Sequence, residues 1–192
     1  MTKIAVIVGA TREGRVTDKL ASWVAKEVAV KASVEVLDLR DYPLPFFDEP
    51  VSPRYNPART PAEAVKKWLE KVNEFDGYVM VTPEYNRSTS GVLKNAIDVL
   101  AYEMDNKPVA LVAHGSAGGG QAISALRTAL PGVGAVTLPQ ALYFTDAVGQ
   151  AIDDEGILKA ELIDNPYGPQ ASLVGLVDSL VKYSEALMSV RG

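Results

Sequence analysis

The sequence predicts an α/β fold in which helices cover both faces of a five-stranded parallel sheet. Five short apolar runs, rich in β-branched residues, alternate with five longer segments whose apolar residues recur every three or four positions. Each apolar run is followed by a polar or glycine-containing loop, after which a helical segment begins. Strands that alternate with helices in this way form parallel sheets with right-handed crossovers.

The composition is that of an ordinary globular protein. With 192 residues and 47% hydrophobic content, the chain is long enough to bury a core, and we expect a single domain over residues 1–192. A net charge of −5 without a basic tract argues against a nucleic-acid partner. No apolar stretch is long enough to cross a membrane, so we expect no membrane partner. The N-terminus enters a strand almost at once, so we expect no signal peptide, and a cytoplasmic location is the default. The absence of cysteine and the single histidine predict no clustered metal site.

The first forty residues predict a strand–helix–strand unit. Residues 3–8 form an apolar run that ends at Gly9, as expected for a buried parallel strand. A polar loop over residues 9–17 follows, and a helix begins near Thr17. The apolar face of this helix consists of Leu20, Trp23, Val24 and Val28. Residues 34–39 predict the second strand.

Residues 40–60 predict an irregular connection. Six prolines from Pro43 to Pro61 prevent a regular strand or a continuous helix. We interpret the segment as a surface connection that Phe46 and Phe47 pin to the core. The alternatives are a flap beside a ligand and a contact between two copies. The run from Thr60 to Glu63 then predicts a helix start, with Thr60 as N-cap of a capping box.

The rest of the chain continues the alternation. The predicted elements are, in order, a strand over 78–82, a helix from about 91 to 102, a strand over 109–113, a helix through 123–130, a strand over 135–138 and a final helix over 173–187. Pro131 and Gly132 stop the helix that precedes the last strand. Residues 140–170 are mixed, with a hairpin-like turn or linker near 153–156.

Polar loops follow the first, third and fourth strands. In the strand order 2-1-3-4-5 these strands are neighbours, and the order reverses between the first and the third. Because the carboxyl ends of parallel strands meet at one edge of a sheet, we expect one ligand to contact all three loops. This convergence is a stronger indication of function than any single loop.

The first loop has the donors that a phosphate needs. Thr11 and Thr17 offer hydroxyl groups, and a helix N-terminus follows. Arg12 and Arg15 offer guanidinium groups suited to a dianion. The alternative is a solvated turn with ordinary surface arginines, and the position after the first strand favours the phosphate site.

A tightly bound dinucleotide is the weaker interpretation. Its Gly-x-Gly-x-x-Gly pattern is broken after the first strand, where Gly9-Ala10-Thr11 lacks the second glycine. Asp38 stands near the position where such sites place an acidic residue, but most aspartates that end strands are solvated.

The other two loops suit a planar ligand such as a flavin. Residues 83–88 form the wall of the crevice, and the glycine-rich residues 115–120 let backbone N–H groups approach a ring edge. Such groups stabilise the negative charge that a reduced flavin gathers near N1 and its C2 carbonyl. The alternative for residues 115–120 is a tight turn that needs glycine for packing.

No side chain is expected to act as an essential acid, base or nucleophile. We expect a structural hydrogen bond for His114, the only histidine. Glu84 is expected to cap Arg87 or the helix that follows rather than to transfer protons. Ser116 does not lie in a Gly-x-Ser-x-Gly pattern.

Motifs in all three loops carry a family resemblance. One long motif consists of Pro83-Glu84-Tyr85-Asn86-Arg87-Ser88 followed by residues 91–98. Two shorter motifs are residues 9–15 and residues 115–119 with Leu126-Arg127. Together they resemble the NAD(P)H-dependent FMN reductases of flavodoxin-like fold, a family that includes chromate, quinone and azoreductase-like enzymes.

The resemblance implies an enzyme that binds FMN and uses NADPH or NADH as co-substrate. Hydride would pass to N5 of the flavin and then to a small-molecule acceptor: a quinone, an azo compound, a metal oxyanion or free flavin. The flavin would carry out the chemistry, so no side chain is expected to be catalytic. Members are usually homodimers or homotetramers, with the helix after residue 90 at the interface. The alternative is an FMN electron carrier or regulatory module that does not significantly oxidise NAD(P)H.

The resemblance also assigns cofactor-binding residues. The phosphate would be held by Thr11, Arg12, Arg15, Val16 and Thr17. The isoalloxazine ring and the ribityl chain would be lined by Pro83, Glu84, Tyr85, Asn86, Arg87 and Ser88. The pyrimidine end would be contacted by Ser116, Ala117 and Gly118.

Three positions depart from the family pattern. Ala10 replaces a common serine, which removes a possible phosphate donor. Ser90 replaces a common proline, which predicts a less rigid loop. Val99 stands where an aromatic residue is common.

Overall fold

A parallel five-stranded sheet forms the centre of the computed structural model, which describes residues 1–145 and 147–191. The strand order is β2-β1-β3-β4-β5, and every neighbouring pair is parallel. The strands are β1 (Lys3–Val8), β2 (Ser33–Asp38), β3 (Gly77–Pro83), β4 (Pro108–His114) and β5 (Val136–Phe144). The predicted fold class and strand order are confirmed.

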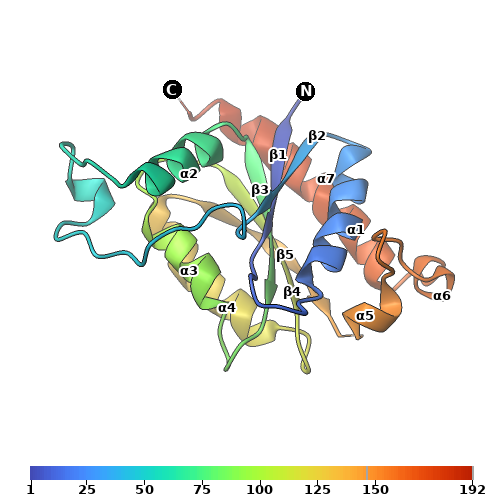
Figure 1. Cartoon of the computed structure of the whole chain (residues 1–192). Coiled ribbons are helices and arrows are strands. Elements are labelled where there is room, and N and C mark those ends of the chain that lie inside the picture. Colours follow the sequence, from blue (N-terminus) through green and yellow to red (C-terminus); the bar gives the residue numbers. More distant parts are fainter. Residues whose placement is uncertain (146, 192) are drawn as a thin grey trace.

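Helices cover both faces of the sheet (Figure 1). One face packs against α1 (Thr17–Ala29) and α7 (Pro169–Met188). The other face packs against α2 (Glu63–Asn73), α3 (Gly91–Asp98) and α4 (Gly120–Ala129). These are the five predicted helices. The described residues also form the short helices α5 (Val148–Ala151) and α6 (Ala160–Ile163), and 3₁₀ turns at Pro53–Tyr55 and Leu130–Val133.

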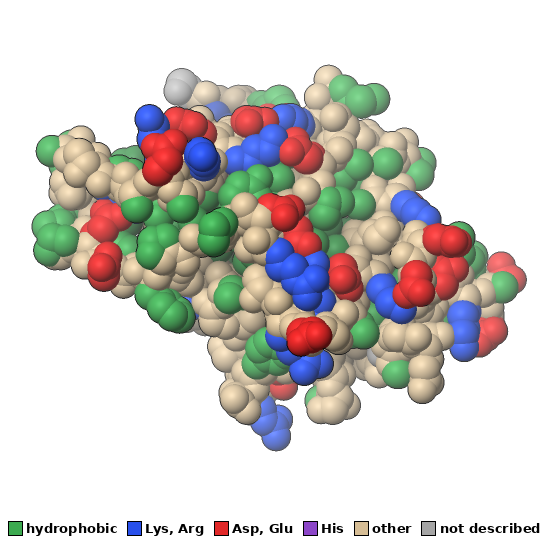
Figure 2. Space-filling view, viewed as in Figure 1, with side chains coloured by type: hydrophobic (Ala, Val, Ile, Leu, Met, Phe, Trp, Pro, Cys, Tyr) green, Lys and Arg blue, Asp and Glu red, His purple; other side chains and the backbone are tan. Residues whose placement is uncertain are grey.

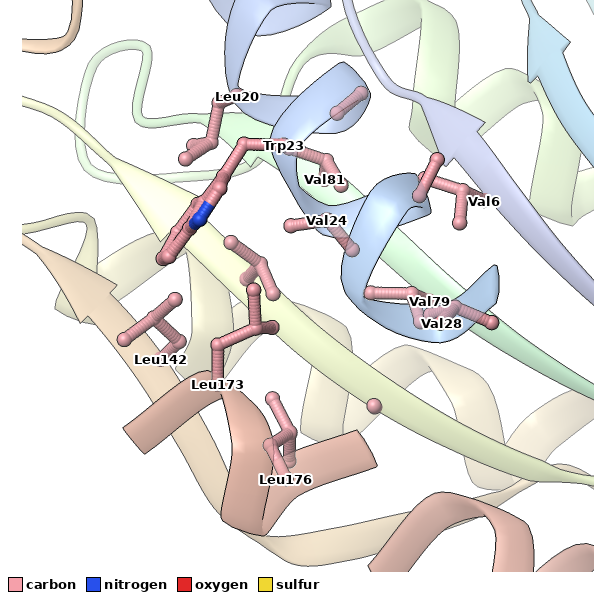
Figure 3. Close-up of a cluster of buried hydrophobic side chains, with 14 of the residues drawn as sticks. Val6, Leu20, Trp23, Val24, Val28, Val79, Val81, Leu142, Leu173 and Leu176 are labelled. Atoms are coloured by element: carbon pink, nitrogen blue, oxygen red, sulfur yellow. The ribbon is translucent and has the colours of Figure 1, made fainter. Parts of the chain in front are cut away.

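Two apolar cores lie on the two faces of the sheet. Figure 3 shows Trp23 of α1 between Leu20 and side chains of β5 and α7. Its ring meets Phe144 edge-on, with centroids 5.8 Å apart, and its Nε1–H donates to Gln170 Oε1 at 2.9 Å. On the other face, Trp68 Nε1 donates to the Ala96 carbonyl at 2.9 Å. Each indole thus buries its ring with its N–H paired, which avoids the cost of an unpaired buried donor.

The loops that follow β1, β3 and β4 emerge at the same edge of the sheet, at the bottom of Figure 1. Hydrogen bonding continues past the strands: Gly9 N donates to Val81 O, and Glu84 N donates to His114 O, both at 2.8 Å. Because the strands are parallel and adjacent, the three loops begin side by side. The predicted convergence of these loops is therefore present.

Residues 40–62 run outward from the sheet and lie over α3 (Figure 1). Asn95 of α3 binds this segment by its backbone: its Oδ1 accepts from Phe47 N at 2.9 Å, and its Nδ2 donates to Pro45 O at 2.8 Å. Phe47 packs against the core, as predicted. Phe46 does not, since 83% of it is exposed. The segment is thus a surface connection pinned by one phenylalanine and one asparagine.

Several predicted boundaries differ from the structure. The capping box at Thr60 is absent, because residues 59–62 remain outside the helix and α2 begins at Glu63 with Ala62 as N-cap. α3 ends at Asp98 instead of residue 102. β5 extends to Phe144 because it pairs with β4 beyond an irregularity near Val109. Ile152 and Leu158 form the expected hairpin-like bridge. No helix among the described residues is long and apolar enough to span a membrane.

Asn95→Ala should loosen the outward segment. The substitution leaves Phe47 N and Pro45 O without partners, so we expect the free energy of unfolding to fall by about 2 kcal/mol. Urea denaturation measures this change, and hydrogen exchange should rise at residues 45–48. The neighbouring variant Lys94→Ala is the control, since it removes only an exposed pair with Asp98. Equal stability of the two variants would contradict the role of Asn95.

Candidate functional site

The loop after β1 begins at a point that only glycine can occupy. A Cβ atom on Gly9 would lie 2.8 Å from both the Val81 carbonyl oxygen and a Leu93 methyl group. The absence of a side chain lets β1 and its loop approach β3 and α3 closely. The loop then runs to Val16, the N-cap of α1, which has no side-chain cap. Lys19 N donates to Asp18 Oδ1 at 3.0 Å, so within the first turn the N–H groups of Thr17 and Asp18 remain available to an anion.

The two arginines of this loop differ in their surroundings. Arg15 is buried, and its guanidinium makes a two-nitrogen contact with the Asp38 carboxylate, with Nη1 2.7 Å from Oδ1. It also donates to Asp18 and to the Ala10 carbonyl. Arg12 is exposed, and its side chain has no hydrogen bond or ion pair among the described residues. Of the two predicted phosphate-binding arginines, Arg12 has a free guanidinium.

The Arg15–Asp38 pair is electrostatically strong. The hydrogen bond with Asp38 raises the pKa of Arg15. Although burial opposes ionisation of Asp38, the contact with Arg15 and the N–H of Arg40 hold its pKa below the ordinary value. Although 25% of its side chain is exposed, Asp38 has both carboxylate oxygens occupied by Arg15 and Arg40, so its role is to anchor the loop.

His114 joins the end of β4 to the start of α1. Its Nε2 lies 2.9 Å from Thr17 Oγ1 in a hydrogen bond. Burial, with a smaller contribution from the Arg12 charge, lowers the pKa of His114 from 6.5 to about 4. The imidazole is therefore neutral near pH 7, and the structural hydrogen bond predicted for it is found.

Residues 85–88 form a two-residue hairpin at the rim of the site. Tyr85 and Ser88 exchange backbone hydrogen bonds of 2.9 and 3.0 Å. Asn86 and Arg87 have φ angles of 48° and 67°, as a type I′ turn requires. The side chains of Tyr85, Asn86 and Arg87 are exposed, whereas Pro83 is buried at the end of β3. A firm turn thus presents polar groups at the rim.

Ser90 fastens this loop through its hydroxyl group. Its hydroxyl accepts from Leu93 N at 3.2 Å, which caps α3, and donates to the Gly9 carbonyl at 2.5 Å. The residue is 1% exposed. These two bonds, which proline would lack, hold the loop to α3 and to the loop after β1, and the lower rigidity expected from the loss of proline stays a prediction.

The loop after β4 is tied to the middle loop through Glu84. Its Oε2 accepts from Gln121 N at 2.9 Å, so it caps α4 rather than Arg87 or α3. Gly118 and Gly119 have φ angles of 75° and 80°, and a Cβ on Gly119 would lie 2.5 Å from Ala113 Cβ. The glycines therefore serve a tight turn. This turn leaves Ser116 and Ala117 exposed beside the middle loop, while Gly118 is buried.

The assembled site suits an elongated ligand with an anionic end and a polar planar end. The anionic end fits the uncapped start of α1, the hydroxyl of Thr11 and the free guanidinium of Arg12. Figure 2 shows basic side chains beside acidic ones over this part of the surface. The planar end fits between residues 85–88 and residues 115–118. These features agree with what FMN requires.

Sequence reasoning missed two supporting residues. Arg40 donates to the Thr11 and Arg12 carbonyls at 3.2 and 2.7 Å. Asn95 holds the segment that borders the site. The position of Arg40, two residues after the strand-ending Asp38, is the one local signal for its role.

Comparisons with known proteins agree with this geometry. Residues 2–149 match the family model described as NADPH-dependent FMN reductase. An NAD(P)H-dependent FMN reductase from Nectria sp is 38% identical over 136 residues, which cover 68% of each chain. A quinone reductase from Pseudomonas putida is 30% identical over 162 residues, covering 81% of this chain and 83% of its own. The solved structure of the NAD(P)H:(acceptor) oxidoreductase FerB from Paracoccus denitrificans matches with a TM-score of 0.76 at 27% identity, over 97% of this chain and 98% of that one.

Neutral His114 predicts a specific pH dependence of stability. The unfolded imidazole takes up a proton near pH 6.5 and the folded one only near pH 4. Between these values the unfolded state binds more protons, so the free energy of unfolding falls as the pH falls. Over this range the free energy of unfolding of the natural protein should fall by about 2 kcal/mol more than that of the His114→Gln variant. Urea denaturation at pH 7 and pH 4.5 measures the difference, and parallel losses in the two proteins would contradict the assignment.

Proposed function

The chain belongs to the NADPH-dependent FMN reductase family, and on that premise we propose that its three-loop site transfers electrons from NAD(P)H to aromatic acceptors of the quinone type. As a member of this family the protein is an oxidoreductase that uses FMN. The observation that carries the proposed site is the convergence of the loops after β1, β3 and β4. When bound, FMN supplies the centre that accepts hydride and passes electrons on.

We assign the chain's residues to the two ends of the cofactor. Thr11, Arg12, Val16 and Thr17 surround the phosphate position, with the N-terminus of α1 beneath it. The hairpin over residues 83–88 forms the wall beside the rings. Ser116 and Ala117 approach the pyrimidine edge with backbone N–H groups, and Gly118, whose N–H donates to the Gly115 carbonyl at 3.0 Å, lies beside them. Because Arg15 is paired with Asp38, we place its side chain behind the loop and not against the phosphate.

We propose no essential proton-transferring side chain. His114 is neutral and bonded to Thr17. Glu84 accepts a backbone N–H at the start of α4. Both residues therefore position loops, and the cofactor retains the chemistry.

We propose that an aromatic acceptor binds in a groove that reaches from Thr11 to Val92, at the start of the helix that follows the middle loop. The groove has a volume of about 400 Å³ and lies between the first loop, the outward segment and the start of α3. Its walls include Leu39, Tyr42, Leu44, Phe46 and Val92. Aromatic walls with a few polar groups are typical of sites for planar apolar molecules. Quinones are thus the favoured acceptor class, with azo compounds, metal oxyanions and free flavin as further candidates.

We further propose that the protein is a single-domain, cytoplasmic homodimer or homotetramer. Hydrophobic side chains gather over the outward segment in Figure 2, and Phe46 and Tyr55 on it are more than four-fifths exposed. Val92, on the outer face of α3, is also exposed. Such an apolar surface supports an interface at α3. Light scattering of the purified protein tests it, and a monomer at micromolar concentration would contradict the proposal.

The reductase activity is tested by anaerobic mixing of the FMN-supplemented protein with NADPH or NADH. We expect rapid bleaching of the flavin absorbance and continued oxidation of the pyridine nucleotide when a quinone is added. Bound FMN that stays oxidised would favour the electron-carrier alternative. Failure to retain FMN would contradict the proposed site itself.

Phe46→Ala should impair the acceptor half of the reaction. Removing an aromatic wall should raise KM for a quinone by about fivefold while KM for NADPH stays unchanged. Tyr55→Ala is the matched control, because Tyr55 is an exposed aromatic residue of the same segment that does not line the groove. Equal quinone KM values in the two variants would place the acceptor elsewhere.

A further inference from the structure

Four consecutive carbonyl groups of the loop after β1 accept hydrogen bonds from side chains outside that stretch. They are the carbonyls of residues 9–12. The donors, in the same order, are Ser90 Oγ, Arg15 Nη1, Arg40 Nε and Arg40 Nη2. The donors come from three separate places: the start of α3, the end of this loop, and the segment after β2.

These bonds fix the direction of the N–H groups that follow. The peptide bonds of this loop are trans, so each N–H points away from the carbonyl of the preceding residue. Each N–H of residues 10–13 therefore points away from the side chain that binds the preceding carbonyl. None of these four N–H groups has an acceptor among the described residues. Ala10 is fully buried, whereas residues 11–13 are half-buried or exposed, so their unpaired N–H groups are the ones most open to a ligand with acceptor oxygens.

Asp38 holds both arginines in place. Its carboxylate pairs with the Arg15 guanidinium and accepts from Arg40 N at 2.9 Å. The Arg15 side chain is only 4% exposed, and its Nε, Nη1 and Nη2 atoms all have partners. A buried guanidinium occupied in this way has no free edge for a phosphate. The arrangement also requires the planar fork of arginine, since lysine offers one charged nitrogen.

We propose that Arg15, Arg40 and Ser90 are positioning residues that turn the N–H groups of residues 10–13 toward the FMN phosphate, and that Arg12 alone among the arginines of residues 9–17 contacts that phosphate. The proposal rests on the proposed binding of FMN at this loop. It separates two kinds of arginine. Arg12 acts through its charge, whereas Arg15 and Arg40 act through the geometry of their hydrogen bonds.

The test compares the affinity for FMN with that for riboflavin, which has the same ring and ribityl chain but no phosphate. Flavin-fluorescence titration gives the two dissociation constants, and their ratio is the phosphate preference. The variants are Arg12→Met, Arg12→Lys, Arg40→Met, Arg40→Lys and Arg15→Lys. The control is Arg54→Met, because Arg54 also donates to a carbonyl and pairs with a carboxylate, but far along the chain at Ala101 and Asp105.

We expect charge to matter at residue 12 and shape to matter at residues 15 and 40. Arg12→Met should lower the phosphate preference about tenfold and weaken its dependence on salt, whereas Arg12→Lys should keep most of both. Arg40→Lys should lower the preference as much as Arg40→Met, by about tenfold, with the salt dependence unchanged. Arg15→Lys should behave like the Arg40 variants, and Arg54→Met like the natural protein.

Three results would overturn the proposal: Arg40→Lys keeping the natural preference, Arg40→Met leaving it unchanged, or the Arg40 variants weakening the salt dependence as Arg12→Met does. If Arg15→Lys does not fold, the two variants at the exposed Arg40 and the variant Ser90→Ala decide the question. Ser90→Ala should also lower the preference for FMN. Near-UV circular dichroism establishes folding of each variant. A natural protein without any preference for FMN over riboflavin would instead contradict the proposed function.

Discussion

The ion pair between Arg15 and Asp38 is the interaction on which the shape of this site depends. It joins the loop after β1 to the end of β2, two elements that meet only because the sheet places them side by side. Removing one partner of such a buried pair typically costs about 3–5 kcal/mol, because the other charge remains buried. The Asp38 carboxylate also positions the backbone of Arg40, because it accepts a hydrogen bond from the Arg40 N–H. A structural charge pair thus sits directly behind a proposed phosphate site.

The other two loops are also held by polar contacts between residues that are distant in the sequence. Ser90 bonds to Gly9, Thr17 to His114, and Glu84 to the first turn of α4. Each bond joins residues at or just after the carboxyl ends of different strands, so the three loops form one continuous wall. His114 and Glu84, the ionisable residues among these, thus hold the wall together. In a family whose chemistry belongs to FMN, positioning of this kind is the principal task of the protein.

The fold was largely predictable from the sequence because apolar periodicity is a local signal. The middle motif indicated the family, and the convergence of the loops followed from the strand order 2-1-3-4-5 of the flavodoxin-like fold. The roles of Ser90 and Arg15 were not predictable, since their partners Gly9 and Asp38 lie 81 and 23 residues away. Position alone could not show that one loop arginine is buried and the other free. Phe46 was misplaced for a similar reason, because the path of a proline-rich segment depends on Asn95.

We propose that FMN binds across the three loops with its phosphate on the N–H groups of residues 10–13. Backbone hydrogen exchange with and without FMN tests this binding most directly. We expect protection by FMN at residues 10–17, 84–90 and 114–120, with the loop after β1 protected much less by riboflavin. Protection confined to other segments, or equal protection of residues 10–13 by riboflavin and FMN, would contradict it.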